Sequence, residues 1–256
     1  MIKNEWRLFL VALQFLTRIP VKSFDGFDTL WLDRSAKYFP LVGALVGTIA
    51  AVVIVAATAV LPQPLPLLFG MAAAIAVTGA FHEDGLADTA DGLGGGQTRE
   101  RRLEIMKDSR IGTYGAIALL VMLAIKSTSL YAIGPIVMAL AFIAAHAAAR
   151  LATVIVIRVL PYAGEIDAAK VKPLATAVTG SELAVAAAFG ILPGLLLLGV
   201  TTFTISFVTA GLAAAVLAAK SRHLIGGYTG DVLGAIEQVF ETTFLVAAAA
   251  VIAGPG

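Results

Sequence analysis

Long, continuous runs of apolar residues limit the fold of this chain more than any other feature. Apolar residues make up 59% of its 256 residues, and charged residues only 14%. Mean hydropathy is +0.92, whereas soluble domains are about a quarter charged. This composition excludes a disordered chain and an ordinary soluble enzyme. It predicts an all-α, polytopic membrane protein.

Two counts narrow the chemistry further. The chain contains no Cys, which excludes disulfides, thiolate metal sites and Cys nucleophiles. Its net charge is +1, so it lacks the basic field that nucleic-acid binding requires, and we expect no nucleic-acid partner.

Seven apolar runs approach the length that crosses a bilayer, which is about 20 residues. A shorter apolar segment, residues 6–15, predicts an N-terminal interfacial or re-entrant helix. We therefore expect one integral-membrane domain over residues 1–256. The predicted spans are about 38–61, 65–82, 112–131, 135–157, 182–199, 203–219 and 232–253.

The charges predict the orientation. Sixteen of the 18 Lys and Arg residues fall in or beside four segments, whereas the short links between the other spans carry no charge. With seven spans, those four segments share one side, which the positive-inside rule assigns to the cytoplasm. We expect a cytoplasmic N-terminus and an outer C-terminus, with any polar chemistry at the cytoplasmic face. The four segments are 1–37, 83–111, 158–181 and 220–231.

A group of carboxylates follows the second predicted span and opens the main candidate active-site segment, at about 82–111. Nothing between 67 and 91 strongly breaks a helix, so we expect the span to continue into this group. Asp84, Asp88 and Asp91 would then share one helix face, with neighbouring Cβ atoms about 5–6 Å apart.

Such like charges repel one another, and the macrodipole at a helix C-terminus disfavours each of them further. Hard oxygen ligands of this kind suit Mg²⁺ or Mn²⁺, which take carboxylates together with substrate phosphates. The alternative is a solvated acidic helix end that nearby Arg residues balance. His82 lies about 160° round the helix from Asp84, so it needs local unwinding or another helix to join the carboxylates.

Two further polar segments belong to the same predicted side. The glycines from Gly92 to Gly96, which include Gly94 and Gly95, predict a helix end and allow close backbone approach to a phosphate. A charged amphipathic helix is predicted over 98–110. Most of its charges fit a solvated surface, but Lys107, Asp108 and Arg110 stand just before the next span.

The segment 226–231 forms a glycine-rich loop before the last span, where a helix N-terminus can bind an anion. It contains Thr229 and Asp231. Asp231 has two readings: a helix N-cap, or a second metal ligand or substrate contact.

Five ionisable residues fall inside predicted spans, where charges are costly and face the bundle interior or a cavity. The four-residue spacings place His146 with Arg150, and Glu237 with Glu241, on shared helix faces. Ion pairs that fix helix register and substrate contacts are equal readings of these two pairs. Lys126, the fifth, is expected to extend toward the outer surface.

These segments together resemble the adenosylcobinamide-GDP ribazoletransferases, also called cobalamin synthases. The resemblance rests on GAFHEDGLADTADG at 79–92 with EIMKDSRIGTYG at 104–115, and it is supported by FLTRIP at 15–20, FPLVG at 39–43 and the segment 226–231. It is collinear over essentially the whole chain. One departure is Glu83, where we expect an apolar residue, so the identity of the metal-binding carboxylates stays open.

The resemblance implies a Mg²⁺-dependent transferase of the bacterial inner membrane that acts at the last stage of cobalamin assembly. Its substrates would be adenosylcobinamide-GDP and α-ribazole or α-ribazole 5′-phosphate, and GMP would be released. Asp84, Asp88, Asp91 and Asp231 are the candidate metal ligands. Either His82 or Asp108 would be the general base. The candidate substrate contacts are Arg102, Lys107, Arg110, Gly94, Gly95 and Thr229.

Two alternatives stay open: an enzyme with the same reaction type, and a protein of a different class. A CDP-alcohol phosphotransferase uses a similar carboxylate cluster, but no Ala-Arg follows Asp91-Gly92, and the later paired Asp residues of that motif are missing. A transporter would need broken helices in the membrane and matching halves, which the sequence does not display. The sequence leaves the metal count and the oligomeric state open, including a homo-oligomer.

Overall fold

The computed structural model describes residues 2–22, 29–164 and 175–254. Its regular secondary structure, within those ranges, is helical. The elements are α1 (Ile2–Leu16), α2 (Thr29–Ser35), the 3₁₀ helix η1 (Ala36–Tyr38), α3 (Phe39–Thr58), α4 (Leu65–Thr78), α5 (Phe81–Gly95), α6 (Arg99–Met106), α7 (Thr113–Tyr131), α8 (Pro135–Val159), α9 (Gly180–Ile225) and α10 (Gly230–Ala253).

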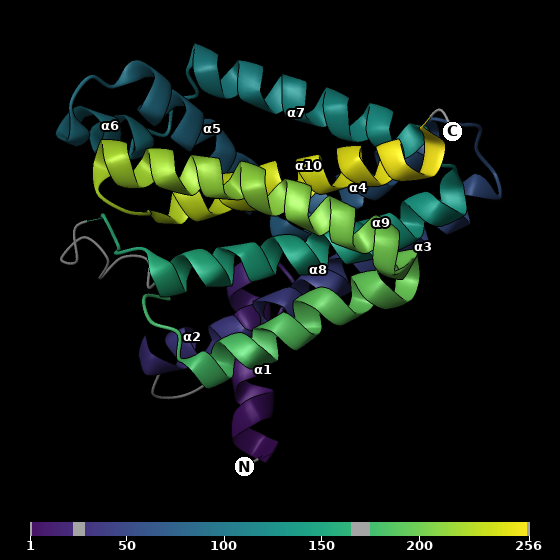
Figure 1. Ribbon diagram of the computed structural model, residues 1–256, viewed down its shortest axis with the longest axis horizontal. Helices are drawn as coiled ribbons and strands as arrows, with labels where there is room; N and C mark the ends of the chain where they lie inside the picture. The colour runs from purple at the N-terminus through teal and green to yellow at the C-terminus, as the bar shows by residue number, and fades with distance from the viewer. Residues whose placement is uncertain (1, 23–28, 165–174, 255–256) are drawn as a thin grey trace.

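Five helices in the described ranges are long and apolar enough to cross a membrane, or six if the bent pair α4 and α5 forms a single span. That number includes α9 once, although Gly199 has non-helical dihedral angles and breaks α9. Figure 1 shows the two arms of α9 running in opposite directions from this break. The arms, 180–198 and 200–225, correspond to two of the seven predicted spans. The polytopic helical fold is therefore confirmed.

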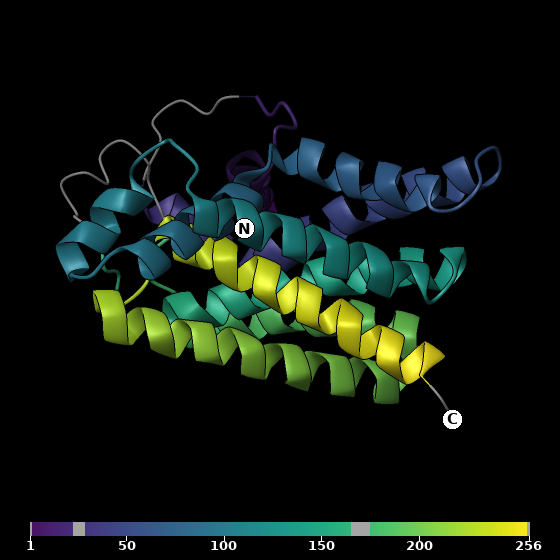
Figure 2. The ribbon, with the colours of Figure 1, turned by 90° about the horizontal axis from the view of Figure 1, so that it is seen from above.

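The long helices run along one axis, and Figure 2 shows α10 between α7 and the second arm of α9. The charged segments gather at one end of this bundle, which we call the polar end; it contains α2, α6, residues 160–164 and the turn 226–230 (Figure 1). The short uncharged links lie at the opposite end. The described parts of the charged segments thus share one end, except α1, which crosses the bundle nearer its middle (Figure 1). Residues 23–28 and 165–174 of these segments lie outside the described ranges.

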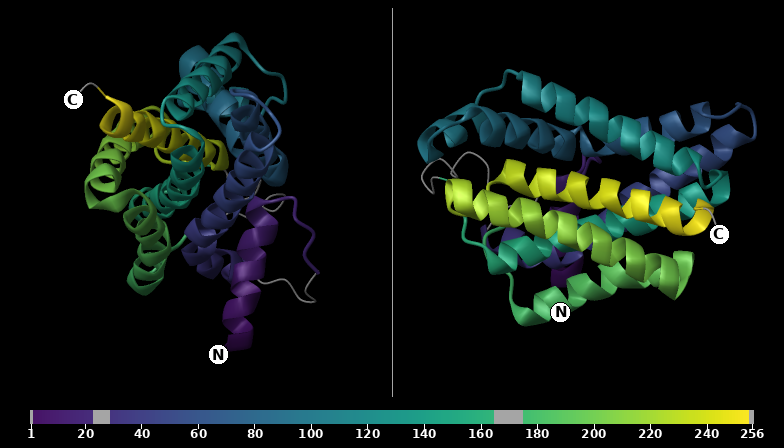
Figure 3. Two further views of the ribbon diagram at one scale, coloured as in Figure 1. Left: turned by 90° about the vertical axis from the view of Figure 1, so that its right-hand side faces the viewer. Right: turned by 45° about the horizontal axis from the view of Figure 1, so that its top comes forward.

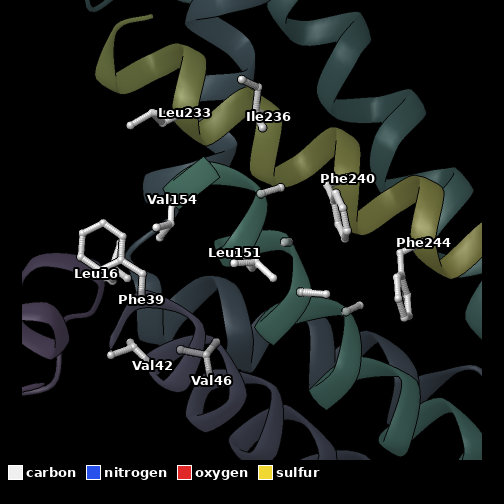
Figure 4. Packing of buried hydrophobic residues seen from close by; sticks show 14 of the residues in the cluster. Leu16, Phe39, Val42, Val46, Leu151, Val154, Leu233, Ile236, Phe240 and Phe244 are labelled. Atoms are coloured by element: carbon white, nitrogen blue, oxygen red, sulfur yellow. The ribbon is translucent and has the colours of Figure 1, made fainter. Parts of the chain in front are cut away.

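Helix α8 forms the centre of the bundle, and 83% of its most apolar 18-residue stretch is buried. Its alanines let neighbouring backbones approach closely, as is usual in membrane helix packing. Gly47 of α3 shows how close: a Cβ there would lie 2.7 Å from the Cα of Ile143. In Figure 4, Leu151 of α8 lies between Val46 of α3 and Phe240 of α10. This core holds α3 and α10 on opposite sides of α8.

The second span does not continue straight into the carboxylate group, so that prediction is wrong. Gly79 and Ala80 both have left-handed backbone angles, with φ of 68° and 58°. They end α4 and start α5 at an angle of 85°. Gly79 tolerates this conformation because it lacks a Cβ, and its amide donates to the Ala76 carbonyl in a helix cap. The bend gives α5 its own direction and carries its carboxylates to the polar end.

Helix α1 confirms the predicted N-terminal helix and extends it in both directions. It crosses the direction of the long helices, as Figures 1 and 3 show. One face, with Leu8, Val11 and Ala12, is buried against the bundle, while Trp6 is exposed. A helix with one apolar face and this crossing direction fits the predicted interfacial position.

Candidate active site

Helix α5 separates two of the predicted carboxylate ligands, Asp84 and Asp88, from His82, one of the two candidate bases. Asp84 is exposed and Asp88 is half-buried, whereas His82 is buried, with its ring 5.3 Å from that of Phe81. All three lie within one continuous helix, so the predicted helical spacing of Asp84 and Asp88 is present. The carboxylates face outward at the polar end, and His82 faces the interior.

The start of α10 lies directly against this part of α5. A Cβ on Gly85 would stand 2.8 Å from the Asp231 carbonyl oxygen and 3.2 Å from the Cα of Gly234. Gly85 and Gly234 therefore let two backbones touch. This contact places Asp231 next to the helix turn that carries Asp84 and Asp88.

Asp231 is not the N-cap of α10, so that reading of it is wrong. Thr229 is the cap, and its hydroxyl accepts a hydrogen bond from the Val232 amide at 3.2 Å. Thr229 is itself buried. The sequence offered both residues near the helix start; Thr229 caps because it is the residue with extended backbone angles just before the first turn.

Replacing Gly85 with Ala is expected to destabilise the protein by about 1–3 kcal/mol, because the added methyl group overpacks a backbone contact. The matched control is Gly211→Ala in α9, where a Cβ meets no described atom within 4 Å. That change is expected to stabilise the helix by about 0.5–1 kcal/mol. Thermal unfolding of both variants in detergent measures the difference. Equal stability of the two variants would contradict the close contact of α5 with α10.

Asp91 binds the start of the next helix. Its two carboxylate oxygens accept hydrogen bonds from the amides of Gly112 at 2.7 Å and Gly115 at 2.9 Å. A Cβ at either glycine would collide with this carboxylate. Asp91 thus satisfies amides at the N-terminus of α7 that lack partners within the helix. Its predicted role as a metal ligand stays a prediction.

Helix α6 folds back on α5 and closes the end of α9. Arg99 donates from Nε to the Ile225 carbonyl at 3.0 Å and from Nη2 to the Ala163 carbonyl at 2.9 Å. Arg102 donates to the Leu224 carbonyl at 3.4 Å. The bonds to Ile225 and Leu224 satisfy carbonyls at the C-terminus of α9, where cations are favourable. Sequence reasoning assigned no such role to Arg99, because its partners are 64 and 126 residues away.

The two glycines that were predicted to contact substrate lie where α5 meets other elements. Gly94 and Gly95 are exposed, and a Cβ on Gly94 would stand 2.9 Å from the ring of Tyr114. The segment continues as helix to Gly95 and ends there, close to the predicted position. The structure thus gives Gly94 a packing role next to α7.

Asp108 and Arg110 form a bidentate pair just after α6. The Asp108 carboxylate accepts hydrogen bonds from Arg110 Nε at 3.0 Å and Nη2 at 2.6 Å. These bonds, together with one from the Arg110 amide, lower the pKa of Asp108 to about 2. The Arg110 side chain is 87% exposed. Asp108 and the buried His82 are therefore very different candidates for a general base.

Tyr162 joins this region from the end of α8, and sequence reasoning missed it. Burial raises the pKa of its hydroxyl, and the nearby Asp231 carboxylate raises it further, while Lys107 lowers it. Its ring lies 5.6 Å from that of Tyr228. The available signal was weak: a Tyr directly after a span, in a segment that the charges assign to the polar side.

A second polar group lies in the middle of the bundle, and we call it the buried ionic cluster. Lys126 Nζ is 2.6 Å from Glu241 Oε1, His146 Nδ1 is 2.5 Å from Glu241 Oε2, and Arg150 Nη1 is 2.6 Å from Glu237 Oε1. The reading of these residues as internal ion pairs is confirmed. The expectation that Lys126 extends outward is wrong, because Glu241 provides a partner inside. The cluster consists of Lys126, His146, Arg150, Glu237, Gln238 and Glu241.

Glu83 belongs with this cluster rather than with the outward carboxylates. Its Oε1 accepts a hydrogen bond from Gln238 Nε2 at 3.1 Å. Gln238 also donates to Glu237, at 2.9 Å, and accepts from Lys126, at 2.6 Å. The additional carboxylate therefore faces the interior, about 100° round α5 from the exposed Asp84.

The described ranges contain one group of three His, Asp or Glu ligand atoms within 4.8 Å of one another, namely His146, Glu237 and Glu241. Lys126 and Arg150 already pair with its carboxylates, which leaves little negative charge for a cation. The predicted ligands on α5 and α10 form no such group of three. Mg²⁺ usually takes only one or two carboxylates and completes its shell with waters and substrate phosphates, so the outward oxygens of Asp84 and Asp88 fit its donor preference.

Comparison with known proteins finds a matching family model and relatives with the same kind of name. The family model described as cobalamin-5-phosphate synthase matches residues 8–249. The chain is 45% identical over 252 residues to a protein of Leptothrix cholodnii named adenosylcobinamide-GDP ribazoletransferase, with 93% of each chain covered. A protein of the same name from Shewanella frigidimarina is 43% identical over 243 residues, covering 93% of this chain and 92% of the relative. No solved structure matches.

Proposed function

Because the chain belongs to the cobalamin-5-phosphate synthase family, and is thus a transferase of cobalamin assembly, we propose that it joins adenosylcobinamide-GDP to α-ribazole or α-ribazole 5′-phosphate. The products are adenosylcobalamin, or its 5′-phosphate, and GMP. The observation that carries this proposal is the contact of Gly85 with the start of α10, which sets Asp231 beside the carboxylate face of α5.

Asp84 and Asp88 are proposed to hold Mg²⁺ together with the substrate diphosphate, and Asp231 is proposed to contribute from α10. A divalent cation here supplies charge neutralisation for the diphosphate and for the departing phosphate. Asp91 keeps the start of α7 in place through its two amide hydrogen bonds. The acidic face is thereby held between α7 and α10.

The reaction is a phosphoryl-group transfer. A ribazole hydroxyl oxygen bonds to the phosphorus attached to the cobinamide arm, the bond from that phosphorus to the GMP oxygen breaks, and the hydroxyl proton passes to a base. Catalysis of such transfers is mainly positioning and electrostatic stabilisation. Lys107 is the C-cap of α6 and Arg110 follows three residues later, and we assign both to the diphosphate or to the departing GMP. Arg102 contributes mainly by holding α6 against the end of α9.

The position of the polar end supports a cytoplasmic active site in the bacterial inner membrane. The charged segments gather there, as the positive-inside rule requires of a cytoplasmic side. The buried ionic cluster argues against transport as the main activity, because its charged side chains pair with one another.

A comparison of two substrates distinguishes the proposed reaction from that of a CDP-alcohol phosphotransferase. The purified protein, with Mg²⁺ and α-ribazole 5′-phosphate, receives adenosylcobinamide-GDP in one arm and a CDP-alcohol with a free alcohol acceptor in the other. We expect GMP in the first arm and no CMP in the second. CMP release without GMP release would identify a CDP-alcohol phosphotransferase. Uptake of adenosylcobinamide-GDP into proteoliposomes without conversion would favour a transporter.

The Asp108 carboxylate is expected to remain ionised down to about pH 2 because Arg110 stabilises the charged form. A fall of kcat/KM between about pH 5 and 7 must then arise from another group, since an efficient base has a pKa near the working pH. In Asp108→Asn, the rate should fall while the midpoint of this acid limb stays in place. Loss of the limb in that variant would identify Asp108 as the titrating base. Arg110→Gln is the second variant of this test, because it removes the guanidinium that stabilises the charged form of Asp108 and leaves the Asp108 carboxylate in place.

A further inference from the structure

An open groove runs along the second arm of α9 beside the end of α8, with a volume of about 350 Å³. Ligand pockets in proteins start at about this size. Its α9 wall consists of small residues, including Gly211, Ala214, Ala215 and Ala218, and Val156 of α8 contributes to the other wall. A Cβ at Gly211 would meet no described atom within 4 Å, so the space beside it is open.

One end of the groove is charged, and the rest is apolar. Arg222 lines the polar end, while Phe207 and Phe240 line the deep end. From Phe207 to Arg222 the helix rises about 22 Å, at about 1.5 Å per residue. One leaflet contributes about half of the ~30 Å hydrocarbon core, so the apolar part of the groove spans about one leaflet.

The cations at this end are not neutralised by the described part of the protein. Arg158, Lys220 and Arg222 are all exposed. No described carboxylate lies within ion-pair distance of any of the three. Arg222 differs from Lys220 because it also lines the groove. The groove therefore combines an apolar trough of leaflet length with a cation at the membrane edge.

We propose that this groove binds one acyl chain of an anionic phospholipid, whose phosphate pairs with Arg222. The chain occupies the trough between α8 and α9, where it replaces side chains that the small residues lack. The headgroup lies at the polar end, where Arg158 adds positive charge. Arginine suits this role because its planar guanidinium binds phosphate through two parallel hydrogen bonds. None of the groove residues belongs to the proposed active site, so the lipid site stands independently of the reaction.

The test uses the whole protein in phosphatidylcholine vesicles that contain a small fraction of chain-spin-labelled phosphatidylglycerol or, separately, chain-spin-labelled phosphatidylcholine. The immobilised spectral component reports chains held by the protein. We expect phosphatidylglycerol to be held preferentially. Arg222→Gln should reduce that preference about fivefold, the effect of one cation near an anionic headgroup. Ala215→Phe should fill the groove and lower the immobilised component for both lipids.

Two matched variants separate the site from general effects. Lys220→Gln removes a cation from the same helix turn outside the groove, and Val216→Phe adds an aromatic ring at an exposed position next to Ala215. Both should bind phosphatidylglycerol as the unchanged protein does. Equal losses in Lys220→Gln and Arg222→Gln would show diffuse attraction and overturn the proposal. An unchanged immobilised component in folded Ala215→Phe would also overturn it. So would an immobilised component that the unchanged protein shows only after dilution to monomers, because a second copy would then occupy the groove.

Discussion

Replacing Asp84 or Asp88 with Ala is expected to lower kcat/KM for GMP release by about 10³-fold or more. A divalent cation contributes several kcal/mol of charge stabilisation to phosphoryl transfer, and each 1.36 kcal/mol is about tenfold in rate. Asp84 is exposed and Asp88 half-buried on the outward face of α5, so neither substitution leaves a large cavity. We therefore expect normal thermal stability together with lost activity and a higher Mg²⁺ requirement.

Glu83→Gln is the matched control for these variants. Glu83 is adjacent to Asp84 in the chain and carries the same charge, but its side chain accepts a hydrogen bond from Gln238 in the interior. The Mg²⁺ dependence of Glu83→Gln should match that of the unchanged protein. If Asp84→Ala and Asp88→Ala both retain near-normal Mg²⁺-dependent transfer, the assignment of the metal ligands is wrong.

Replacing Glu241 with Leu is expected to destabilise the protein by about 3–5 kcal/mol, because it leaves buried cations without their partner. Glu241 pairs with Lys126 at 2.6 Å and with His146 at 2.5 Å, and all three side chains are buried. The double variant Lys126→Met with Glu241→Leu should recover a substantial part of this loss, because it removes both charges of the main pair.

With Lys126→Met alone as the fourth protein, the free energy of unfolding in mixed micelles measures these differences as a double-mutant cycle. Glu104→Gln is the control, because Glu104 pairs with Arg101 at 2.7 Å but is 70% exposed. Exposed pairs contribute about 0–1 kcal/mol, so this control should unfold almost as the unchanged protein does. A loss in Glu241→Leu no larger than in Glu104→Gln would show that the cluster does not hold α7, α8 and α10 together.

The positions of these spans along the chain were predictable because they depend on local composition. Apolar runs of bilayer length give α3, α7, α8 and α10 close to their predicted positions. The common location of the charged segments followed from counting Lys and Arg. The break at Gly79 and Ala80 was not predictable, because Ala80 has a φ of 58°, a backbone angle that alanine rarely adopts.

The candidate site also has features that the sequence predicts and features that it does not. Helical spacing correctly placed Asp84 and Asp88 on one continuous helix. The partners of Asp91, Arg99 and Lys126 were beyond sequence reasoning, since each contact joins residues at least 21 positions apart. Spacing within one helix says which side chains share a face, but only the packing of several helices decides what that face meets.

The most direct test of the central proposal is GMP release by the purified protein in detergent, supplied with adenosylcobinamide-GDP, α-ribazole 5′-phosphate and Mg²⁺, with EDTA in a parallel sample. We predict GMP and a cobalamin product in equal amounts with Mg²⁺, and neither with EDTA. Folded protein that releases no GMP under these conditions would contradict the proposed reaction. Equal release with and without EDTA would contradict the role given to Asp84 and Asp88.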